Sequence, residues 1–149
     1  METSPPGRGL ATLLGFAGLI PFVGLAAAAL TGFAPMGVDP VFTLGAYGAT
    51  ILSFLGGIQW GFVLSPGRPA GVKYGALRLA LGVAPQLIGW AALLLAPPAS
   101  LIVLAVALAG HLVVDWTASR DGLAPGWFLS LRTPLSLGAA ASLLAAALL

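Results

Sequence analysis

One apolar stretch near the middle of the chain reads YGATILSFLGGIQWG and runs from Tyr47 to Gly61. Small residues in and just before it recur at helical spacing: Gly45, Ala49, Ser53 and Gly56 share one side of a helix with Trp60, and Gly57 and Gly61 lie on the next side. In water, so many glycines would destabilise a helix, whereas in lipid every backbone polar group must be satisfied within the segment. The stretch therefore predicts the central membrane helix of a bundle, with close neighbours packed against its small residues.

The composition of the whole chain also indicates that most of it lies in a lipid bilayer. Of the 149 residues, 59% are hydrophobic and 7% are charged, and the mean hydropathy is +1.05. A soluble domain carries about 25% charged residues, so a soluble fold of this length could not cover its surface with these side chains. The basic residues form no stripe, which argues against a nucleic-acid partner, and the absence of cysteine excludes disulfides and iron–sulfur clusters.

Five apolar segments approach the roughly 20 residues that a membrane span needs. We expect an all-α integral membrane protein with a single transmembrane domain, residues 1–149, whose five helices cover about residues 9–33, 41–64, 74–95, 100–116 and 127–149. Short breaks rich in proline and glycine separate them, as is typical of helix ends. The first segment is longer than the apolar region of a signal peptide, which spans about 7–15 residues, so we interpret it as a membrane helix.

The basic residues predict the orientation of this bundle. All six fall on one side of the expected topology: Arg8, Arg68, Lys73, Arg78, Arg120 and Arg132. Because basic residues concentrate on the cytoplasmic side, we expect a cytoplasmic N-terminus and a periplasmic C-terminus in a bacterial inner membrane.

Several polar side chains are expected at a similar depth near the cytoplasmic side, and such residues inside a membrane are costly and usually functional. These are Gln59, Trp60, Arg78, Asp115 and Arg132. We expect Asp115 to pair with Arg132 or Arg78, with Gln59 close by. Two arginines against one carboxylate leave a positive excess suited to an anionic lipid head group or another anion. The alternative is a structural ion pair with the arginines reaching toward the interface.

A second candidate site is the pair His111 and Asp115. These residues are four apart and share a helix face, a spacing that suits a proton relay in which the carboxylate orients the imidazole. The alternative is a histidine that is hydrogen-bonded inside the bundle for structural reasons.

Glycine and proline mark the expected helix contacts and kinks. The sequence repeats Gly-x-x-Pro at Pro21 and Pro85, which indicates either two broken helices around a transport site or a chance recurrence. We expect close helix packing at five glycines: Gly56, Gly57, Gly61, Gly82 and Gly89. We also expect Gln86, near the middle of the membrane, to hydrogen-bond across the bundle.

The residues present argue against several chemistries. A single histidine excludes a bis-histidine haem and leaves a metal site without enough ligands. Lys73, the sole lysine, lies in a loop, which excludes a mid-membrane Schiff base, and no serine lies in a Gly-x-Ser-x-Gly elbow. We therefore expect no enzyme activity, cofactor or metal.

Four stretches carry a family resemblance: GLIPF at 18–22, the 47–61 stretch, VAPQLIGW at 83–90, and PGWFLSLR at 125–132 followed by Leu135 and Ser136. Together they resemble the transmembrane protein 69 family, also called domain of unknown function 3429. The resemblance implies a small multi-helix inner-membrane protein of bacteria and mitochondria, without a named activity. It also implies that four residues matter: Trp60, Pro85, Trp127 and Arg132. The chain departs from the family pattern at Gln59, where histidine is expected, and at Phe128, where tyrosine is expected.

Three functions remain open from the sequence. The first is a non-catalytic accessory or assembly component of a larger inner-membrane complex, of a respiratory kind, with membrane lipids and other membrane-protein subunits as partners. The second is a small channel or transporter with a polar site at Arg78, Asp115 and Arg132. The third is a lipid- or quinone-binding module that uses Trp60, Trp90 and Arg132.

Overall fold

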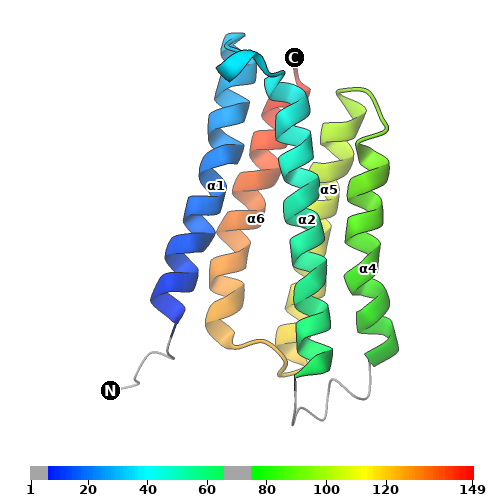
Figure 1. Cartoon of the computed structure of the whole chain (residues 1–149). Coiled ribbons are helices and arrows are strands. Elements are labelled where there is room, and N and C mark those ends of the chain that lie inside the picture. Colours follow the sequence, from blue (N-terminus) through cyan, green and yellow to red (C-terminus); the bar gives the residue numbers. More distant parts are fainter. Residues whose placement is uncertain (1–6, 66–74) are drawn as a thin grey trace.

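The computed structural model describes residues 7–65 and 75–149, and these fold into five α-helices without a strand (Figure 1). The helices are α1 (Arg8–Thr31), α2 (Pro40–Leu64), α4 (Gly75–Ala92), α5 (Ala99–Arg120) and α6 (Gly126–Ala147), with a short 3₁₀ turn, η1 (Pro35–Gly37), before α2. They run alternately up and down, so the start of α1 and the end of α6 lie at opposite ends of the bundle (Figure 1).

The helix ends differ from the expected ones at two places. Helix α5 continues to Arg120, four residues past the expected end, and it is therefore not the shortest helix of the described chain. Helix α4 ends at Ala92, after 18 residues, and not at residue 95. The expected start of this helix, residue 74, lies outside the described residues.

The helix termini follow from local chemistry. At the start of α2 the carboxylate of Asp39 accepts a hydrogen bond from the backbone N–H of Val41 at 2.9 Å, and Pro40 occupies the first helical position. Helix α1 ends at Thr31, and the cap residue Gly32 has a φ of 67°, the left-handed conformation that glycine adopts readily.

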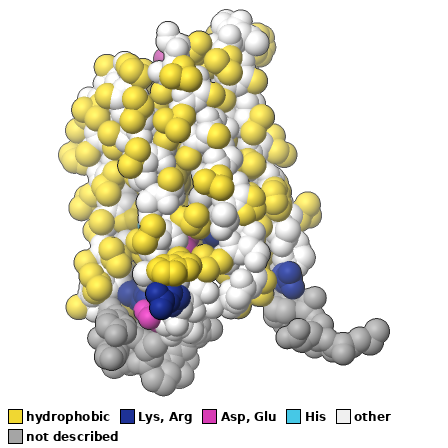
Figure 2. Space-filling model, turned by 180° about the vertical axis from the view of Figure 1, so that it is seen from behind, with side chains coloured by type: hydrophobic (Ala, Val, Ile, Leu, Met, Phe, Trp, Pro, Cys, Tyr) yellow, Lys and Arg dark blue, Asp and Glu magenta, His cyan; other side chains and the backbone are white. Residues whose placement is uncertain are grey.

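Four of the helices are long and apolar enough to cross a membrane: α1, α2, α5 and α6. Helix α4, the helix expected as the third of five spans, is not one of these four. As far as its residues are described, it is not long and apolar enough to meet the same criterion. Its sequence explains the difference, because 18 residues include Arg78, Pro85 and Gln86. Hydrophobic side chains cover the visible flank of the bundle, and basic side chains lie toward one end (Figure 2).

Helix α2 lies at the centre of the bundle, as the sequence led us to expect, and packs against all four other helices. The core is built mainly from leucine and alanine. Its largest fully buried apolar side chains are Phe22, Leu44, Leu52, Leu101, Leu104, Leu108, Leu123 and Leu143.

Three of the expected packing glycines lie at the contact between α2 and α4. A Cβ atom added at Gly56 would collide with the backbone carbonyl of Gly82, and one added at Gly89 would lie 3.2 Å from the carbonyl oxygen of Ala49. The backbones of the two helices therefore touch because neither carries a side chain there. Gly57 and Gly61, by contrast, face open space, so the close packing expected of them is not realised within the described chain.

The prolines do not break their helices. Helix α1 continues through Pro21 and α4 continues through Pro85, so the two discontinuous helices of the transport hypothesis are not observed. Helix α6 contains a third internal proline, Pro134. Membrane helices tolerate proline because neighbouring groups satisfy the freed backbone carbonyl.

Candidate functional site

A buried carboxylate, Asp115 of α5, lies at the centre of a polar network between the helices. Its side chain is fully shielded from solvent. One oxygen, Oδ2, accepts a hydrogen bond from Nε of Arg132 in α6 at 2.9 Å. The other oxygen, Oδ1, accepts one from Nε2 of Gln59 in α2 at 3.2 Å. The sequence-based expectation named these partners, and the structure brings them together.

The network extends to a fourth helix through Arg78 of α4. Nη1 of Arg78 donates to Oε1 of Gln59 at 3.0 Å, and Nη2 donates to the carboxylate of Asp121, which follows α5 directly. We refer to Gln59, Arg78, Asp115, Asp121 and Arg132 as the ionic network. It joins α2, α4, α5 and α6, and each of its members reaches at least one other.

Asp121 is not among the residues expected from the sequence, and its carboxylate changes the charge of the site. With Asp121 beside Arg78 and Asp115 beside Arg132, two carboxylates balance two guanidinium groups. The positive excess that would hold an anion is therefore not present in this cluster. The signal for Asp121 was its place in the polar break Ser119–Gly122, one residue after the helix that carries Asp115.

His111 lies close to the network without joining it. Its Nε2 is 3.8 Å from Oδ1 of Asp115, too far for a hydrogen bond, and that oxygen accepts its hydrogen bond from Gln59. Nε2 of this buried imidazole has no hydrogen-bond partner among the described residues. The contact that a proton relay from His111 to Asp115 requires is thus not formed. Nor do residues 7–65 and 75–149 hold a group of three His, Cys, Asp or Glu side chains that could bind a metal ion.

Two other candidate residues lie apart from the ionic network. The indole of Trp60 donates to the backbone carbonyl of Leu79 at 3.2 Å and thereby ties α2 to α4. Gln86 faces outward from α4 and hydrogen-bonds to no other described residue, contrary to the expected bond across the bundle. The rotation of α4 explains this, because its glycines and Pro85 turn toward α2 and leave Gln86 on the opposite side.

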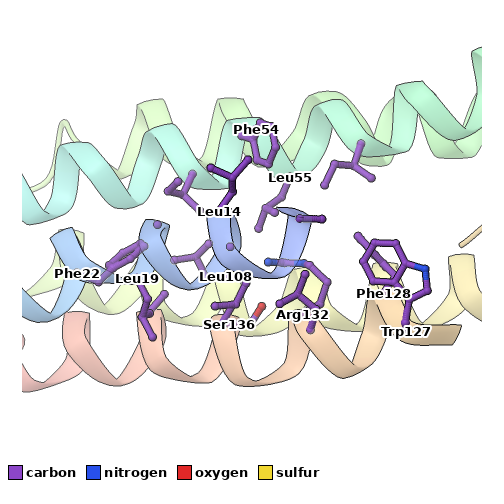
Figure 3. A pocket seen from close by; sticks show the side chains of 18 residues that line it. Leu14, Leu19, Phe22, Phe54, Leu55, Leu108, Trp127, Phe128, Arg132 and Ser136 are labelled. Carbon is purple, nitrogen blue, oxygen red and sulfur yellow. The ribbon is translucent and has the colours of Figure 1, made fainter. Parts of the chain in front are cut away.

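A cavity of about 370 Å³ adjoins the network between α1, α2 and α6 (Figure 3). Leucine, isoleucine and phenylalanine make up most of its wall, and Arg132 and Ser136 contribute the polar groups. Both residues are more than nine-tenths buried. Yet Nη2 of Arg132 and Oγ of Ser136 find no hydrogen-bond partner within the described chain. A polar floor with unused donors under an apolar cavity suits an amphipathic ligand.

Comparison with known proteins gives a family-level match. A family model described as "Protein of unknown function (DUF3429)" matches residues 8–148. A protein of Xenopus tropicalis named "Transmembrane protein 69" is 37% identical over 139 residues, which are 89% of this chain and 51% of that protein. The mouse protein of the same name is 48% identical over 80 residues, which are 52% of this chain and 31% of that protein.

The chain thus spans about half the length, or less, of these curated relatives. No solved structure matches the chain. The names of the relatives agree with the apolar helices in indicating a multi-pass membrane protein.

Proposed function

This chain belongs to the DUF3429 family, and from that premise we propose that it is a non-catalytic component of a larger membrane complex. It would bind a second membrane protein through the outward face of α4. Two features support the proposal: the way the ionic network uses its charges, and the position of Gln86.

The ionic network supports a structural role over a transport path. Each guanidinium of the network faces a carboxylate and Gln59 bridges the two pairs, so the cluster carries no net charge that would attract a passing ion. Buried charges that are paired and hydrogen-bonded hold their helices in one arrangement, whereas a conducting path needs groups that exchange partners with the solute. This favours the accessory role over a channel or transporter.

Gln86 is the observation that carries the proposal. It lies eleven residues after the start of α4, about 16 Å along the helix at a rise of about 1.5 Å per residue. An amide facing lipid at this depth loses its hydrogen bonds, which is why such side chains usually contact another helix. Its exposed neighbours Leu87, Ile88 and Trp90 surround it with apolar surface. We infer that a transmembrane helix of a partner offers Gln86 a polar group.

The setting belongs to the same proposal. We propose a complex of the respiratory kind and place it in a bacterial inner membrane, one of the two settings that the family resemblance implies. The described basic residues support a cytoplasmic N-terminus, since Arg8, Arg78, Arg120 and Arg132 all lie toward the end of the bundle that holds the start of α1.

Purification in a mild detergent tests the proposal. The tagged chain from native membranes should bring down one defined membrane protein in a stable ratio. Gln86→Leu should reduce its recovery about threefold to thirtyfold, since one hydrogen bond between membrane helices contributes about 0.6–2 kcal/mol.

Thr50→Leu is the matched control for this experiment. It also replaces an exposed polar side chain of a membrane helix by leucine, but the hydroxyl of Thr50 already donates to the carbonyl of Ala46 in its own helix at 2.9 Å. Recovery of the partner should therefore not change. A wild-type chain that purifies alone, or a Gln86→Leu variant that retains the partner in full, would contradict the proposal.

A further inference from the structure

The cavity between α1, α2 and α6 has a polar floor that no helix contact explains. Arg132 uses Nε to hold Asp115, and its Nη2 remains unpaired although the side chain is buried. Ser136 lies one turn further along α6 and is 2% exposed, and its hydroxyl also lacks a partner among the described residues. Figure 3 shows both side chains among the apolar residues of the cavity wall. Buried donors without partners are rare and costly, so two in one cavity indicate a hydrogen-bonding ligand.

From this floor we propose that the cavity binds a neutral amphiphile of the quinone class, with one carbonyl oxygen accepting hydrogen bonds from Nη2 of Arg132 and Oγ of Ser136. This site is independent of the partner proposed for α4, which lies on the other side of α2.

Charge balance selects a neutral head group. Arg132 already faces Asp115, and Arg78 already faces Asp121, so the cluster carries no net charge among the described residues. An anion entering the cavity would bring a charge without a counter-ion into a region of low dielectric, and nothing would offset its loss of hydration. A carbonyl oxygen satisfies the same two donors without that cost.

Depth argues against an ordinary phospholipid. Helix α6 has 22 residues, about 33 Å at a rise of about 1.5 Å per residue, close to the thickness of about 30 Å of a hydrocarbon core. Arg132 lies six residues after the start of α6 and Ser136 lies ten, which are depths of about 9 Å and about 15 Å. The charged head group of a phospholipid holds its ester groups near the interface, whereas a compact neutral ring on an apolar tail can enter further.

The wall and the mouth of the cavity fit a ring with a tail. Four aromatic side chains line it, Phe22, Phe54, Trp127 and Phe128, and offer faces and edges on which a planar ring can pack. Leu14 of α1 and Phe54 of α2 are 61% and 66% exposed, so the cavity opens between these helices toward the lipid. The volume of about 370 Å³ matches the lower range of small-molecule sites, about 300–1,000 Å³. Of the three residues that the sequence suggested for a quinone site, Arg132 lines this cavity, and Trp60 and Trp90 do not.

Titration with decylubiquinone tests the proposal. The full chain, reconstituted in phosphatidylcholine nanodiscs, should show a saturable rise in Tm as the quinone fraction increases. Ser136→Ala should raise the apparent Kd about twofold to tenfold, the change expected from the loss of one hydrogen bond. Because Ser136 has no partner within the described chain, this substitution should leave the fold intact.

Ser142→Ala is the matched control in the same helix. The hydroxyl of Ser142 already donates to the carbonyl of Gly138 at 2.9 Å, so the apparent Kd should equal that of the wild type. Decylbenzene, which has a ring and a tail but no acceptor, should bind more weakly than decylubiquinone.

Palmitate, which supplies a carboxylate, should also bind more weakly than decylubiquinone, because each arginine of the cluster already faces a carboxylate. Tighter binding of palmitate would overturn the neutral head group, and equal binding of all three probes would reduce the cavity to a non-specific apolar groove. No saturable change, or an unchanged Kd for Ser136→Ala, would overturn the site itself.

Discussion

At the scale of single residues, Asp115 of α5 connects its helix to three others, α2, α4 and α6. It binds Arg132 and Gln59 directly and reaches Arg78 through the amide of Gln59. Isolated in lipid, any of these charges would be costly, yet in this arrangement each guanidinium has a carboxylate. Removing one partner leaves the others buried without compensation, which costs more than the pair contributes.

Asp115→Asn should therefore lower the free energy of unfolding by about 3–5 kcal/mol, because Arg132 loses its counter-ion in a buried site. Asp121→Asn should have a clearly smaller effect, since the side chain of Asp121 is 35% exposed and water can replace it. Thermal unfolding of the purified variants in one detergent gives the comparison. Equal destabilisation by the two substitutions would show that the buried pair does not dominate the network.

Residue positions were predictable where depth alone decided them. Asp115, Arg132 and Gln59 lie near the same end of three helices, so their meeting followed from the topology. The role of Asp121 depended on the path of a turn, and the outward direction of Gln86 depended on the rotation of α4. The sequence determines neither feature. Several rotations of α4 about its axis would place small residues against the bundle, and the sequence does not select among them.

At the scale of elements, the contact between α2 and α4 depends on missing side chains. Gly56 and Gly82 lie opposite each other, and a Cβ added at Gly82 would lie 2.8 Å from the carbonyl oxygen of Gly56. In lipid, where apolar surface gives little drive for association, such close approach is a main source of helix–helix stability. The bond from Trp60 to Leu79 adds a polar contact beside it.

Gly56→Ala should separate α2 from α4 locally and lower stability by about 1–3 kcal/mol, as overpacking of a tight contact does. Gly57→Ala is the control one position away, where an added methyl group meets nothing within 4 Å. Unfolding of both variants in mixed micelles of increasing denaturing-detergent fraction gives the measurement. A Gly57→Ala variant as unstable as Gly56→Ala would mean that backbone effects, and not packing, determine the loss.

At the scale of the whole molecule, the charges are polarised along the bundle. The cations Arg8, Arg78, Arg120 and Arg132 belong to one end, and Arg120 lies over the ring of Trp116 at 4.7 Å. Aromatic and basic residues together are typical of a membrane interface. The number of helices followed from hydropathy alone, whereas the longer α5 did not, because its last turn, through Arg120, reads as a polar loop.

A cytoplasmic location of this end predicts the labelling of two single-cysteine variants, in a chain without native cysteine. Val38→Cys, between α1 and α2, should react with an impermeant maleimide added outside intact spheroplasts. Gly126→Cys, at the start of α6, should react only after permeabilisation. The reverse pattern would invert the orientation, and labelling of both from outside would contradict the alternation of the helices.

Helix α1 takes no part in the ionic network, and this has a mechanical consequence. Among the described side chains, one hydrogen bond joins it to another helix, from the hydroxyl of Tyr47 to the carbonyl of Gly18 at 2.8 Å, and the remaining attachment is apolar. Dispersion forces resist sliding far less than paired charges do. We therefore expect helix α1 to move more readily than the four helices that share the ionic network, which would let a bulky ligand enter sideways from the membrane.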